Sequence, residues 1–366
     1  MKFIVSTLAL KNILTDACAF ISDKGSSLNQ AVILRLTDNN LEVLTKSAIS
    51  NPYRQMAFKG IENVDGIEDG IVAANASKLN LLVSNFNLKE EIQVSTTKDY
   101  IKLNQNSCDF KLKKTDLSEE TEKELLEFFD KFDTEAEFIT INEFPTFIKK
   151  VAVATDKNAH MTALRSVCMD YTNEKLHFVA TDGKRISNMA IQLKGKGSYI
   201  IPVEVAKLMA NKDVNQLWIN NNSILFKKGN RYYWSSIYTE TYPAWRNVLA
   251  PKIDSEKITV KKSDIIDALN RANIVADKAI RRVFLTVEDN KMTLTSSSMD
   301  GSFTETIDCE NTKPTTISIK NDYLYDAINA SDSDEIVIHF GEDNRPILIT
   351  DDDPRYRALI APMNKN

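Results

Sequence analysis

The sequence has 366 residues, which is enough for two or three domains of ordinary size. It contains 46 Lys and Arg against 51 Asp and Glu, a formal net charge of −5, and 43% hydrophobic residues. With only 10 Gly and 9 Pro, this composition excludes a disordered or a collagen-like chain. Lys11 and Asp16 interrupt the apolar start and no uncharged apolar run reaches ~18 residues, so we expect a cytoplasmic protein without a signal peptide or membrane span.

The chain begins with a short strand-like stretch from Lys2 and a helix-like pattern, and the same order returns at Glu137 and Lys257. The three starts are 135 and 120 residues apart. In each helix apolar residues recur at i, i+3, i+4 and i+7, which predicts one buried stripe per helix. The stripes are Leu10, Ile13, Leu14 and Ala17; Phe144, Phe147, Ile148 and Val151; and Ile265, Ala268, Leu269 and Ala272.

Each segment continues with an alternating strand pattern, a second short helix, and further strands with hairpin turns. The alternating stretches are LEVLT from Leu41, LHFVAT from Leu176 and MTLTSS from Met292. We therefore predict an α+β fold of three repeats, each with two helices packed on antiparallel sheets. The predicted domains are 1–120, 137–250 and 256–366, with a charge-rich first linker to about 136 that contains a short helical turn, and a second linker near 247–256.

Four cysteines and three histidines are spread over these segments without any CxxC pair. They are Cys18, Cys108, Cys168 and Cys309, and His160, His177 and His339. We expect no zinc site and no other metal or cofactor, and we expect the thiols to be buried in a reducing compartment.

Motifs for catalysis are weak in this sequence. No GxxxxGK[ST] loop, GxSxG elbow or HExxH pair is present, and the KGKG run at 194–197 lacks the spacing of a phosphate loop. Asp182 and Gly183 favour a tight turn without a chemical role. The acidic run Asp351–Asp353 could hold Mg²⁺ through its carboxylates or form a solvated turn before Pro354. A non-catalytic protein is favoured, and a metal-dependent DNA-processing enzyme that uses this run is the alternative.

Four segments resemble the signatures of the bacterial sliding clamp, the beta subunit of DNA polymerase III. They are FVATDGKRIS from Phe178, TYPAWRNVLAP from Thr241, NRPILIT from Asn344 and YRALIAPMNKN from Tyr356. The resemblance implies the DNA-clamp fold, closed by a head-to-tail homodimer into a ring with helices around a central hole and sheets outside. It implies a non-catalytic accessory subunit of a DNA polymerase (nucleotidyltransferase) complex. This processivity factor encircles double-stranded DNA, independently of its sequence, during DNA replication.

By the same resemblance, the DNA polymerase, the clamp loader and other proteins bind one pocket through short clamp-binding peptides. The pocket residues carried over by position are Leu164, Thr181, Gly183, Lys184, Arg185, Ile186, Pro243, Asn247, Val248, Tyr323, Pro346, Leu348, Ile360, Ala361, Pro362 and Met363. The chain departs from the family at Asn247, where a basic residue is frequent, and at its end, Asn364–Asn366, so the peptide preference stays open. Ser166 replaces the family's usual glycine, which leaves DNA contact at that loop open. A clamp-like protein of a mobile element that binds host partners is a further alternative.

A ring of this kind needs positive charge only on its inner helices and nearby loops, which reconciles DNA binding with a net charge of −5. The candidate DNA-facing residues are Lys11, Lys24, Lys78, Lys149, Lys150, Lys194, Lys196, Lys207 and Arg271. For each of them an ordinary solvated side chain is the alternative.

Ring closure requires an edge of the first repeat to pair with an edge of the third repeat in the partner subunit. The resemblance implies that Phe110 and Leu112 meet Ile274 and Val275 across this dimer interface. The alternative is that all four residues belong to intramolecular cores.

Overall fold

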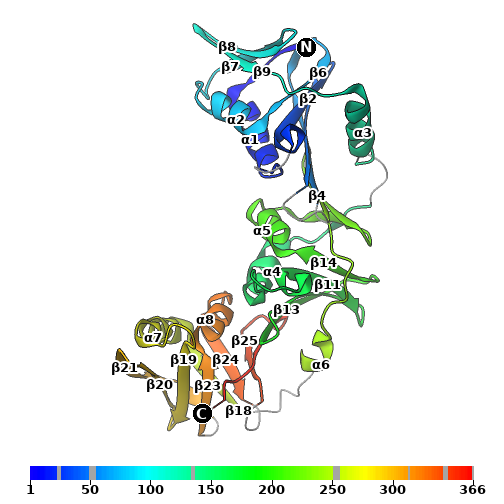
Figure 1. Ribbon diagram of the computed structural model, residues 1–366. Coiled ribbons are helices and arrows are strands. Elements are labelled where there is room, and N and C mark those ends of the chain that lie inside the picture. The colour runs from blue at the N-terminus through cyan, green and yellow to red at the C-terminus, as the bar shows by residue number, and fades with distance from the viewer. Residues whose placement is uncertain are drawn as a thin grey trace. The chain divides into compact units, whose positions relative to one another are not determined.

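The computed structural model describes residues 1–22, 26–48, 55–132, 137–249, 256–311, 314–340 and 345–364 (Figure 1). The chain forms two compact units. Unit 1 consists of Met1–Asn142 and Val214–Ile237, and unit 2 consists of Glu143–Asp213 and Tyr238–Asn366. Each unit has its own sheets and its own cores.

Unit 1 contains one narrow and one wide antiparallel sheet. The five-stranded sheet has the order β5 (Asp65–Glu68), β1 (Lys2–Ser6), β7 (Glu91–Thr96), β8 (Tyr100–Gln105) and β9 (Cys108–Lys113). The eight-stranded sheet has the order β10 (Ile139–Thr140), β15 (Gln216–Ile219), β16 (Ser223–Lys228), β17 (Arg231–Ser236), β4 (Gln55–Asn63), β3 (Asn40–Ala48), β2 (Ala31–Thr37) and β6 (Gly70–Asn75). The helices are α1 (Thr7–Cys18), α2 (Ala76–Ser84), α3 (Glu119–Asp130) and the 3₁₀ turn η1 (Ser27–Gln30).

Unit 2 is built in the same way. Its nine-stranded sheet has the order β14 (Ser198–Pro202), β11 (Ser166–Thr172), β12 (Lys175–Thr181), β13 (Arg185–Gln192), β26 (Tyr356–Ile360), β25 (Ile347–Thr350), β24 (Glu335–Phe340), β18 (Glu256–Lys261) and β22 (Glu310–Asn311). The four-stranded sheet has the order β21 (Gly301–Asp308), β20 (Lys291–Ser298), β19 (Arg282–Glu288) and β23 (Thr315–Lys320). The helices are α4 (Phe144–Val151), α5 (Val203–Asn211), α6 (Trp245–Leu249), α7 (Lys262–Val275), α8 (Asn321–Asn329) and the 3₁₀ turns η2 (Ala152–Ala154) and η3 (Thr162–Arg165).

The three predicted helical stripes are confirmed. All twelve of their residues are buried in α1, α4 and α7, and each of these helices packs against a second one, giving the pairs α1 and α2, α4 and α5, and α7 and α8. Local sequence fixes where the helices begin: the side chain of Ser6 accepts the N–H of Ala9 before α1, and that of Asn75 accepts the N–H of Lys78 before α2. The α+β class is therefore confirmed.

Each wide sheet joins strands of two successive predicted repeats. β4 from the first repeat pairs with β17 from the second, and β13 from the second pairs with β26 from the third. The second repeat therefore contributes strands to both units, whereas the predicted domain limits follow the chain. Those three limits stay a prediction.

The first linker differs from the prediction of a short helical turn. α3 has twelve residues, with Leu125, Phe128 and Phe129 on its inner side, and Phe132 follows two residues past its end at the same spacing of i, i+3, i+4 and i+7. Phe129 is fully buried against the eight-stranded sheet. Ser118 starts the helix by accepting the N–H of Thr121, and three glutamates in the first turn suit the positive end of the helix dipole.

The cysteines differ partly from the prediction. Cys168 and Cys309 are buried and Cys18 is half-buried, but Cys108 is exposed on the edge strand β9. Burial raises the pKa of Cys18 to about 11, so its thiol is unreactive at neutral pH. Across the described ranges, no helix combines the length and apolar character needed to cross a membrane.

Candidate functional site

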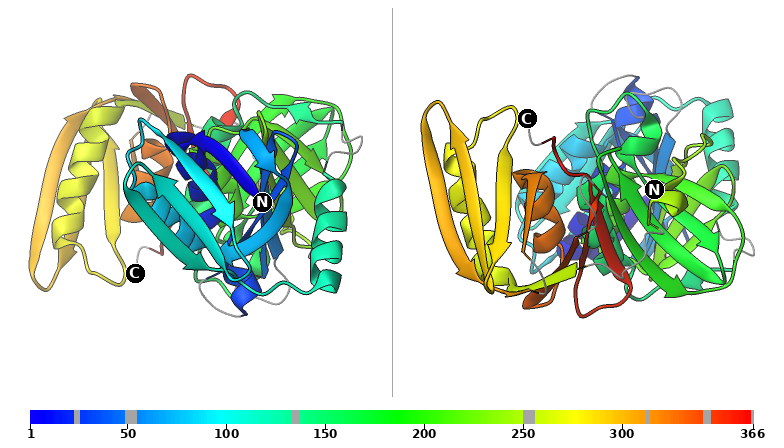
Figure 2. Two further views of the ribbon diagram at one scale, coloured as in Figure 1. Left: turned by 90° about the horizontal axis from the view of Figure 1, so that it is seen from above. Right: turned by 90° about the horizontal axis from the view of Figure 1, so that it is seen from below.

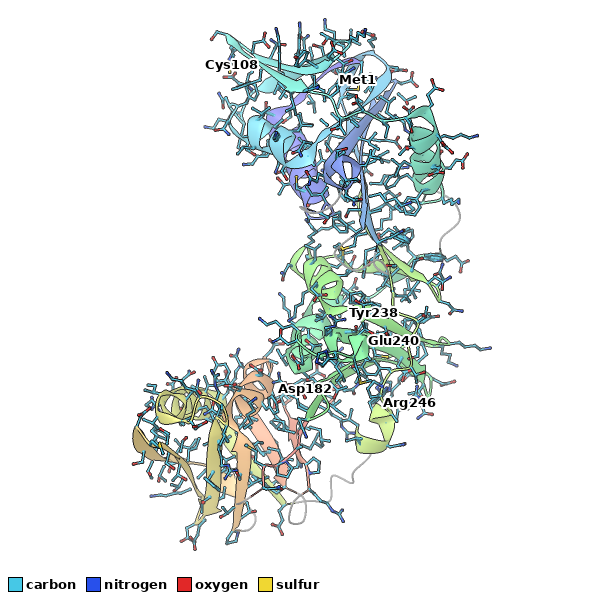
Figure 3. All side chains as sticks on the ribbon, viewed as in Figure 1. Met1, Cys108, Asp182, Tyr238, Glu240 and Arg246 are labelled. Carbon is cyan, nitrogen blue, oxygen red and sulfur yellow. The ribbon has the colours of Figure 1, made fainter. Side chains whose placement is uncertain are left out.

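A cavity of about 260 Å³ opens in unit 2 where the β12–β13 turn, α6 and the C-terminal segment meet. Its lining residues are Thr181, Gly183, Lys184, Arg185, Ile186, Pro243, Ala244, Trp245, Val248, Pro346, Leu359 and Ala361. Nine of these were predicted from the sequence; Ala244, Trp245 and Leu359 were not. Figure 3 labels Asp182 on the turn and Arg246 on α6, the two elements that flank this cavity.

The turn between β12 and β13 is held rigid by its own side chains. The Thr181 hydroxyl donates to the carbonyl of Arg185 at 2.6 Å and accepts the N–H of Gly183 at 3.0 Å. One carboxylate oxygen of Asp182 accepts the N–H groups of Lys184 and Arg185 at 2.8 and 3.0 Å. Gly183 has φ +86°, which favours glycine at this position. The sequence ATDG therefore specifies the cavity wall locally.

Arg185 is a fixed cation at the rim of the cavity. Its side chain is 11% exposed and forms ion pairs with Asp182 at 3.1 Å and with Asp326 at 2.6 Å. The guanidinium also lies 4.4 Å from the ring centroid of Tyr323. Tyr323 is not among the lining residues and packs against Arg185, so its predicted contact with a peptide stays a prediction. Since two carboxylates already balance the charge of Arg185, it offers geometry more than net positive charge.

The segment YPAWR is anchored to the sheet by polar contacts on both sides of Pro243. The Tyr242 hydroxyl donates to the carbonyl of Val179 on β12 at 3.3 Å. On the other side the indole N–H of Trp245 donates to a carboxylate oxygen of Asp170 on β11 at 2.9 Å, and the guanidinium of Arg246 pairs with the same oxygen. The Asp170 side chain is 3% exposed. These contacts fix α6 over β11 and β12, so that it forms the second wall.

His177 on β12 supports the same helix. Its ring centroid lies 5.0 Å from that of Trp245, and the side-chain amide of Asn188 lies within hydrogen-bond distance of its Nδ1. Burial lowers the pKa of His177, so the ring is neutral at pH 7. The sequence alone indicates only a possible metal ligand at His177 and not this contact with Trp245.

The floor of the cavity is an apolar cluster on the wide sheet. Five sheet residues, which we call the unit 2 patch, pack together there: Cys168, Val179, Ile186, Leu348 and Leu359. Trp245 and Leu249 of α6 close this cluster from above. Leu348 was predicted as a wall residue, but it is 8% exposed and belongs to the floor beneath the cavity.

The other predicted pocket residues lie outside the cavity lining. Ile360 is 1% exposed and lies outside the lining, so its contact with a peptide stays a prediction. Leu164 in η3 is half-buried, and Asn247 on α6 is exposed. Pro362 and Met363 are half-buried in the tail, where the N–H of Met363 donates to the carbonyl of Ser318 at 2.8 Å. Backbone pairing thus holds the tail against unit 2.

Most candidate DNA-facing residues lie on exposed positions of their helices or loops. Exposed side chains are found at Lys78, Lys149, Lys194, Lys196, Lys207 and Arg271, and Lys11 is half-buried. Two of these charges have acidic partners: Lys194 pairs with Glu174 at 3.0 Å and Arg271 pairs with Glu305 at 2.6 Å. Lys24 lies outside the described residues.

Lys150 contradicts the prediction that its charge faces DNA. Its side chain is 4% exposed and its ammonium lies 3.1 Å from Asp332 and 3.7 Å from Asp351. The Asp351 carboxylate is fully buried and also accepts the hydroxyl of Ser331 at 2.6 Å. Lys150 is therefore a structural ion-pair partner of the acidic run.

The side chains of Asp351 and Asp353 in the acidic run form ion pairs with other residues of this chain. Besides Asp351, the Asp353 carboxylate pairs with Arg355 at 2.8 Å, and this arginine lowers the pKa of Asp353. No group of three or more acidic, histidine or cysteine side chains in the described part of the chain could hold a metal ion. The proposed Mg²⁺ site at this run is not supported, because Lys150 and Arg355 occupy the position that a cation would take.

The four predicted dimer residues lie at the surface of their units. Phe110 on β9 is 37% exposed and packs edge-on against Phe86, and Leu112 is half-buried. In the last turn of α7, Ile274 is 82% exposed and Val275 is half-buried. The alternative that all four are core residues is contradicted by the exposure of Ile274.

Comparison with known proteins gives a consistent result. Two family models match, described as the DNA polymerase III beta subunit, central domain over 139–244 and C-terminal domain over 247–364. The beta sliding clamp of Staphylococcus aureus is 28% identical over 197 residues, 50% of this chain and 52% of that protein. That of Staphylococcus epidermidis is 27% identical over 204 residues, 52% of this chain and 54% of that protein. The chain thus spans about half the length of the curated relatives it matches.

Solved structures show the same fold over the full length. The crystal structure of the DNA polymerase III subunit beta from Pseudomonas aeruginosa superimposes with a TM-score of 0.87 at 16% identity, covering 100% of both chains. A sliding clamp of the same organism bound to griselimycin gives 0.87 at 15% identity, covering 100% of this chain and 99% of that chain.

Proposed function

Because the chain belongs to the DNA polymerase III beta subunit family, we propose that it is a DNA sliding clamp. Acting in the cytoplasm, it encircles double-stranded DNA and tethers a DNA polymerase without catalysing a reaction itself. The observation that carries this proposal is the cavity of unit 2, whose two walls are the ATDG turn and the YPAWR segment. Clamp loaders and other proteins with short clamp-binding peptides would use the same cavity.

The chemistry of the cavity suits a short apolar peptide. Ile186, Pro243, Val248 and Leu359 offer apolar surface, and Val248 is 45% exposed in the absence of a partner. Burying a single Leu or Phe anchor in such a cavity contributes about 1.5–3 kcal/mol. The fixed guanidinium of Arg185 at the rim orients polar groups of the peptide.

A matched pair of variants tests the peptide site. Val248→Asp places a charge in the cavity, whereas Asn247→Asp places the same charge on the neighbouring residue, which is exposed and does not line the cavity. With a fluorescein-labelled clamp-binding peptide of a bacterial replicative polymerase, we expect at least about tenfold weaker binding for Val248→Asp only. Equal binding by both variants would contradict the assignment of the cavity.

The way in which the repeats join supports a homodimer. β4 pairs with β17, and β13 pairs with β26, so each repeat offers one strand edge to the next repeat. In strand order, β9 of the first repeat corresponds to β17 and β26, and β21 of the third repeat corresponds to β4 and β13. The third junction of this kind would therefore pair β9 of one copy with β21 of a second copy. Among the described residues, β21 pairs with β20 alone and β9 with β8 alone, which leaves one edge of each strand open within its unit. Pairing these edges would extend both narrow sheets and close the ring.

The pairing of β4 with β17 also predicts which residues of β9 and β21 would lie opposite each other in the dimer. Tyr233 on β17 lies opposite Phe58 on β4, with ring centroids 5.4 Å apart. The equivalent position on β9 is Phe110, three residues past a two-residue hairpin turn, and the equivalent position on β21 is Phe303. We therefore place Phe110 opposite Phe303 across the dimer, beside the exposed Ile274 on α7.

Cysteine cross-linking tests this register. In a chain with Cys108→Ser, the pair Phe110→Cys and Phe303→Cys should form an intermolecular disulfide under mild oxidation. The pair Phe110→Cys and Thr304→Cys should not, because neighbouring strand residues point to opposite faces. A mass of one chain by light scattering at micromolar concentration would refute the dimer.

DNA retention tests the clamp function itself. After loading by a bacterial clamp loader, we expect the protein to stay on nicked circular plasmid during gel filtration in high salt and to leave once the plasmid is linearised. High salt removes ordinary electrostatic binding but not a topological link. Equal retention on circular and linear DNA would refute the proposal.

A further inference from the structure

The apolar floor under the unit 2 cavity has a counterpart in unit 1. The pairs Cys168 with Val179, Ile186 with Leu359, and Leu348 with Leu359 lie side by side in the nine-stranded sheet. In the eight-stranded sheet the corresponding cross-strand pairs are Ile33 with Leu44, Ala57 with Trp234, and Leu225 with Trp234. We call these five residues the unit 1 patch. Both patches are apolar and both bridge two predicted repeats.

The two patches are covered by different linkers. In unit 2 the five-residue helix α6 covers one side of its patch and leaves a cavity of about 260 Å³. In unit 1 the twelve-residue helix α3 lies on the patch. Figures 1 and 2 show α3 on the face of the wide sheet opposite to α1 and α2. Four consecutive residues of β2, from Ala31 to Leu34, are buried, because the sheet is covered on both faces.

α3 contacts the patch as an amphipathic helix contacts a groove. Leu125, Phe128, Phe129 and Phe132 form the inner stripe, at the spacing that helical ligands use for their anchors. The ring of Phe128 packs edge-on against Trp234 with centroids 5.2 Å apart. The outer side carries the exposed acidic residues Glu120, Glu124 and Glu127.

Polar contacts position the helix at its C-terminal end. Arg35 on β2 donates to the carboxylate of Asp130 at 3.2 Å, and the ammonium of Lys46 on β3 lies 4.1 Å from the ring centroid of Phe128. At the other end, the chain before α3 is attached to β6 by the N–H of Thr115, which donates to the carbonyl of Ala73.

Two cavities flank the N-terminal half of α3. One, of about 240 Å³, reaches from Lys98 and Asp99 to Leu117 and Glu122, and the other, of about 260 Å³, reaches from Asn29 and Gln55 to Thr121 and Leu125. α3 therefore contacts the sheet mainly through its apolar stripe and its C-terminal end, and its N-terminal half is less closely packed.

We propose that the unit 1 patch is a helix-docking groove equivalent to the unit 2 cavity, and that α3 is its built-in occupant. The chain thus holds a ligand in cis at its first repeat junction and leaves its second junction open. The docking of α3 does not depend on the proposed clamp function. The consequence that each chain offers one open partner cavity rests on that function.

The test supplies α3 in trans. The probe is a fluorescein-labelled peptide of residues 117–132, LSEETEKELLEFFDKF. The full chain with Phe129→Asp carries a charge on the buried side of its own α3, which should release the helix without altering the sheet. We expect this variant to bind the probe one to one, and we expect the unaltered chain, whose groove is filled, to bind it at least about tenfold more weakly.

Three controls assign the binding to the groove. A probe peptide with Phe129→Asp should not bind, and Trp234→Ala added to the Phe129→Asp chain should weaken binding of the original probe at least about tenfold. Val248→Asp in the unit 2 cavity should leave binding of the probe unchanged. Loss of binding through Val248→Asp would place the probe in unit 2 and overturn the proposal.

If the Phe129→Asp chain does not fold by itself, rescue of its folding by the probe peptide tests the same docking site. The probe peptide should then restore its near-ultraviolet circular dichroism and its thermal transition, and the Phe129→Asp peptide should not. A folded Phe129→Asp chain that binds no probe, or an unfolded one that the probe does not rescue, would overturn the proposal.

Discussion

Replacing Lys150 by methionine should destabilise unit 2 without involving DNA. The ammonium lies 3.7 Å from the carboxylate of Asp351, and the two side chains are 4% and 0% exposed. At an effective dielectric of ~20, their gross attraction is on the order of 4 kcal/mol. Lys150→Met keeps the length and the apolar stem of the side chain but leaves Asp351 charged and buried, which typically costs ~3–5 kcal/mol.

We expect a loss at the lower end of that range, about 3 kcal/mol. Asp351 keeps two hydrogen bonds, from the hydroxyl of Ser331 and the N–H of Asp353, which continue to stabilise the carboxylate. The second partner of Lys150, Asp332, is 77% exposed and adds little, because water screens its charge.

Hydrogen exchange of the full chain, read by mass spectrometry on peptides from α4 and β25, measures this loss locally. The matched control is Lys149→Met, since Lys149 is the neighbouring lysine of α4 and is exposed. It should change the free energy of opening by less than about 0.5 kcal/mol. The double variant with Asp351→Asn should recover part of the loss, because it removes the uncompensated charge.

The result that refutes this reasoning is a loss below about 1 kcal/mol for Lys150→Met, or a loss equal to that of Lys149→Met. Such a result, together with a reduced salt dependence of DNA binding for Lys150→Met, would return Lys150 to the DNA-facing set.

Three further predictions concern the walls of the cavity. Asp170→Asn should weaken binding of the polymerase peptide about tenfold in a fluorescence titration, because α6 loses the carboxylate that holds Trp245 and Arg246. Burial lowers the pKa of His177 in the folded protein, so the unfolded chain binds a proton at His177 more readily than the folded one. The free energy of unfolding is therefore kept above the unfolded pKa of ~6.5 and falls as the pH drops below it. His177→Phe should reduce this fall, measured by urea unfolding at pH 7.5 and at pH 5.5. Gly183→Ala should cost about 1 kcal/mol of unfolding free energy, because φ is +86° while no atom lies within 4 Å of the added methyl group; an unchanged midpoint would show that the turn adapts.

The sequence was most informative where a contact is local. The stripe of α1, the stripe of α7 and the ATDG turn each depend on residues within a few positions of one another, so their spacing predicts their structure. The resemblance added the composition of the cavity, since its walls come from segments whose order matches the family.

Long-range contacts were not predictable from one sequence. Trp245 and Asp170 are 75 residues apart, and nothing in either segment indicates that an indole N–H and a buried carboxylate meet. The same reason explains why Lys150 was wrongly predicted to face DNA. Its position in the helix fits the exposed face, but the side chain is buried by its partner Asp351, which comes from another repeat. A helix position alone does not show which distant strand covers it.

The error at α3 has a different origin. Its apolar residues repeat with the spacing of a buried stripe, but the high density of charged residues in KKTDLSEETEKELLEFFDKFDTEA favoured a solvated linker. Composition outweighed periodicity in that interpretation, although a helix that covers one face of a sheet needs only one apolar side. The acidic residues lie on the other side, where water solvates them.

The linkers, more than the sheets, determine what each repeat junction presents. Both junctions place five apolar residues in the same register, so the underlying surface is similar in chemistry. A helix of five residues anchored at Trp245 and Leu249 covers one side of such a surface. A twelve-residue helix with Phe128 and Phe129 in its last turn, followed by Phe132 just past its end, reaches farther across it. Helix length at 1.5 Å per residue sets this difference, about 8 Å against about 18 Å. One sheet geometry can therefore support an open cavity or a closed one, and the length of the covering helix selects between them.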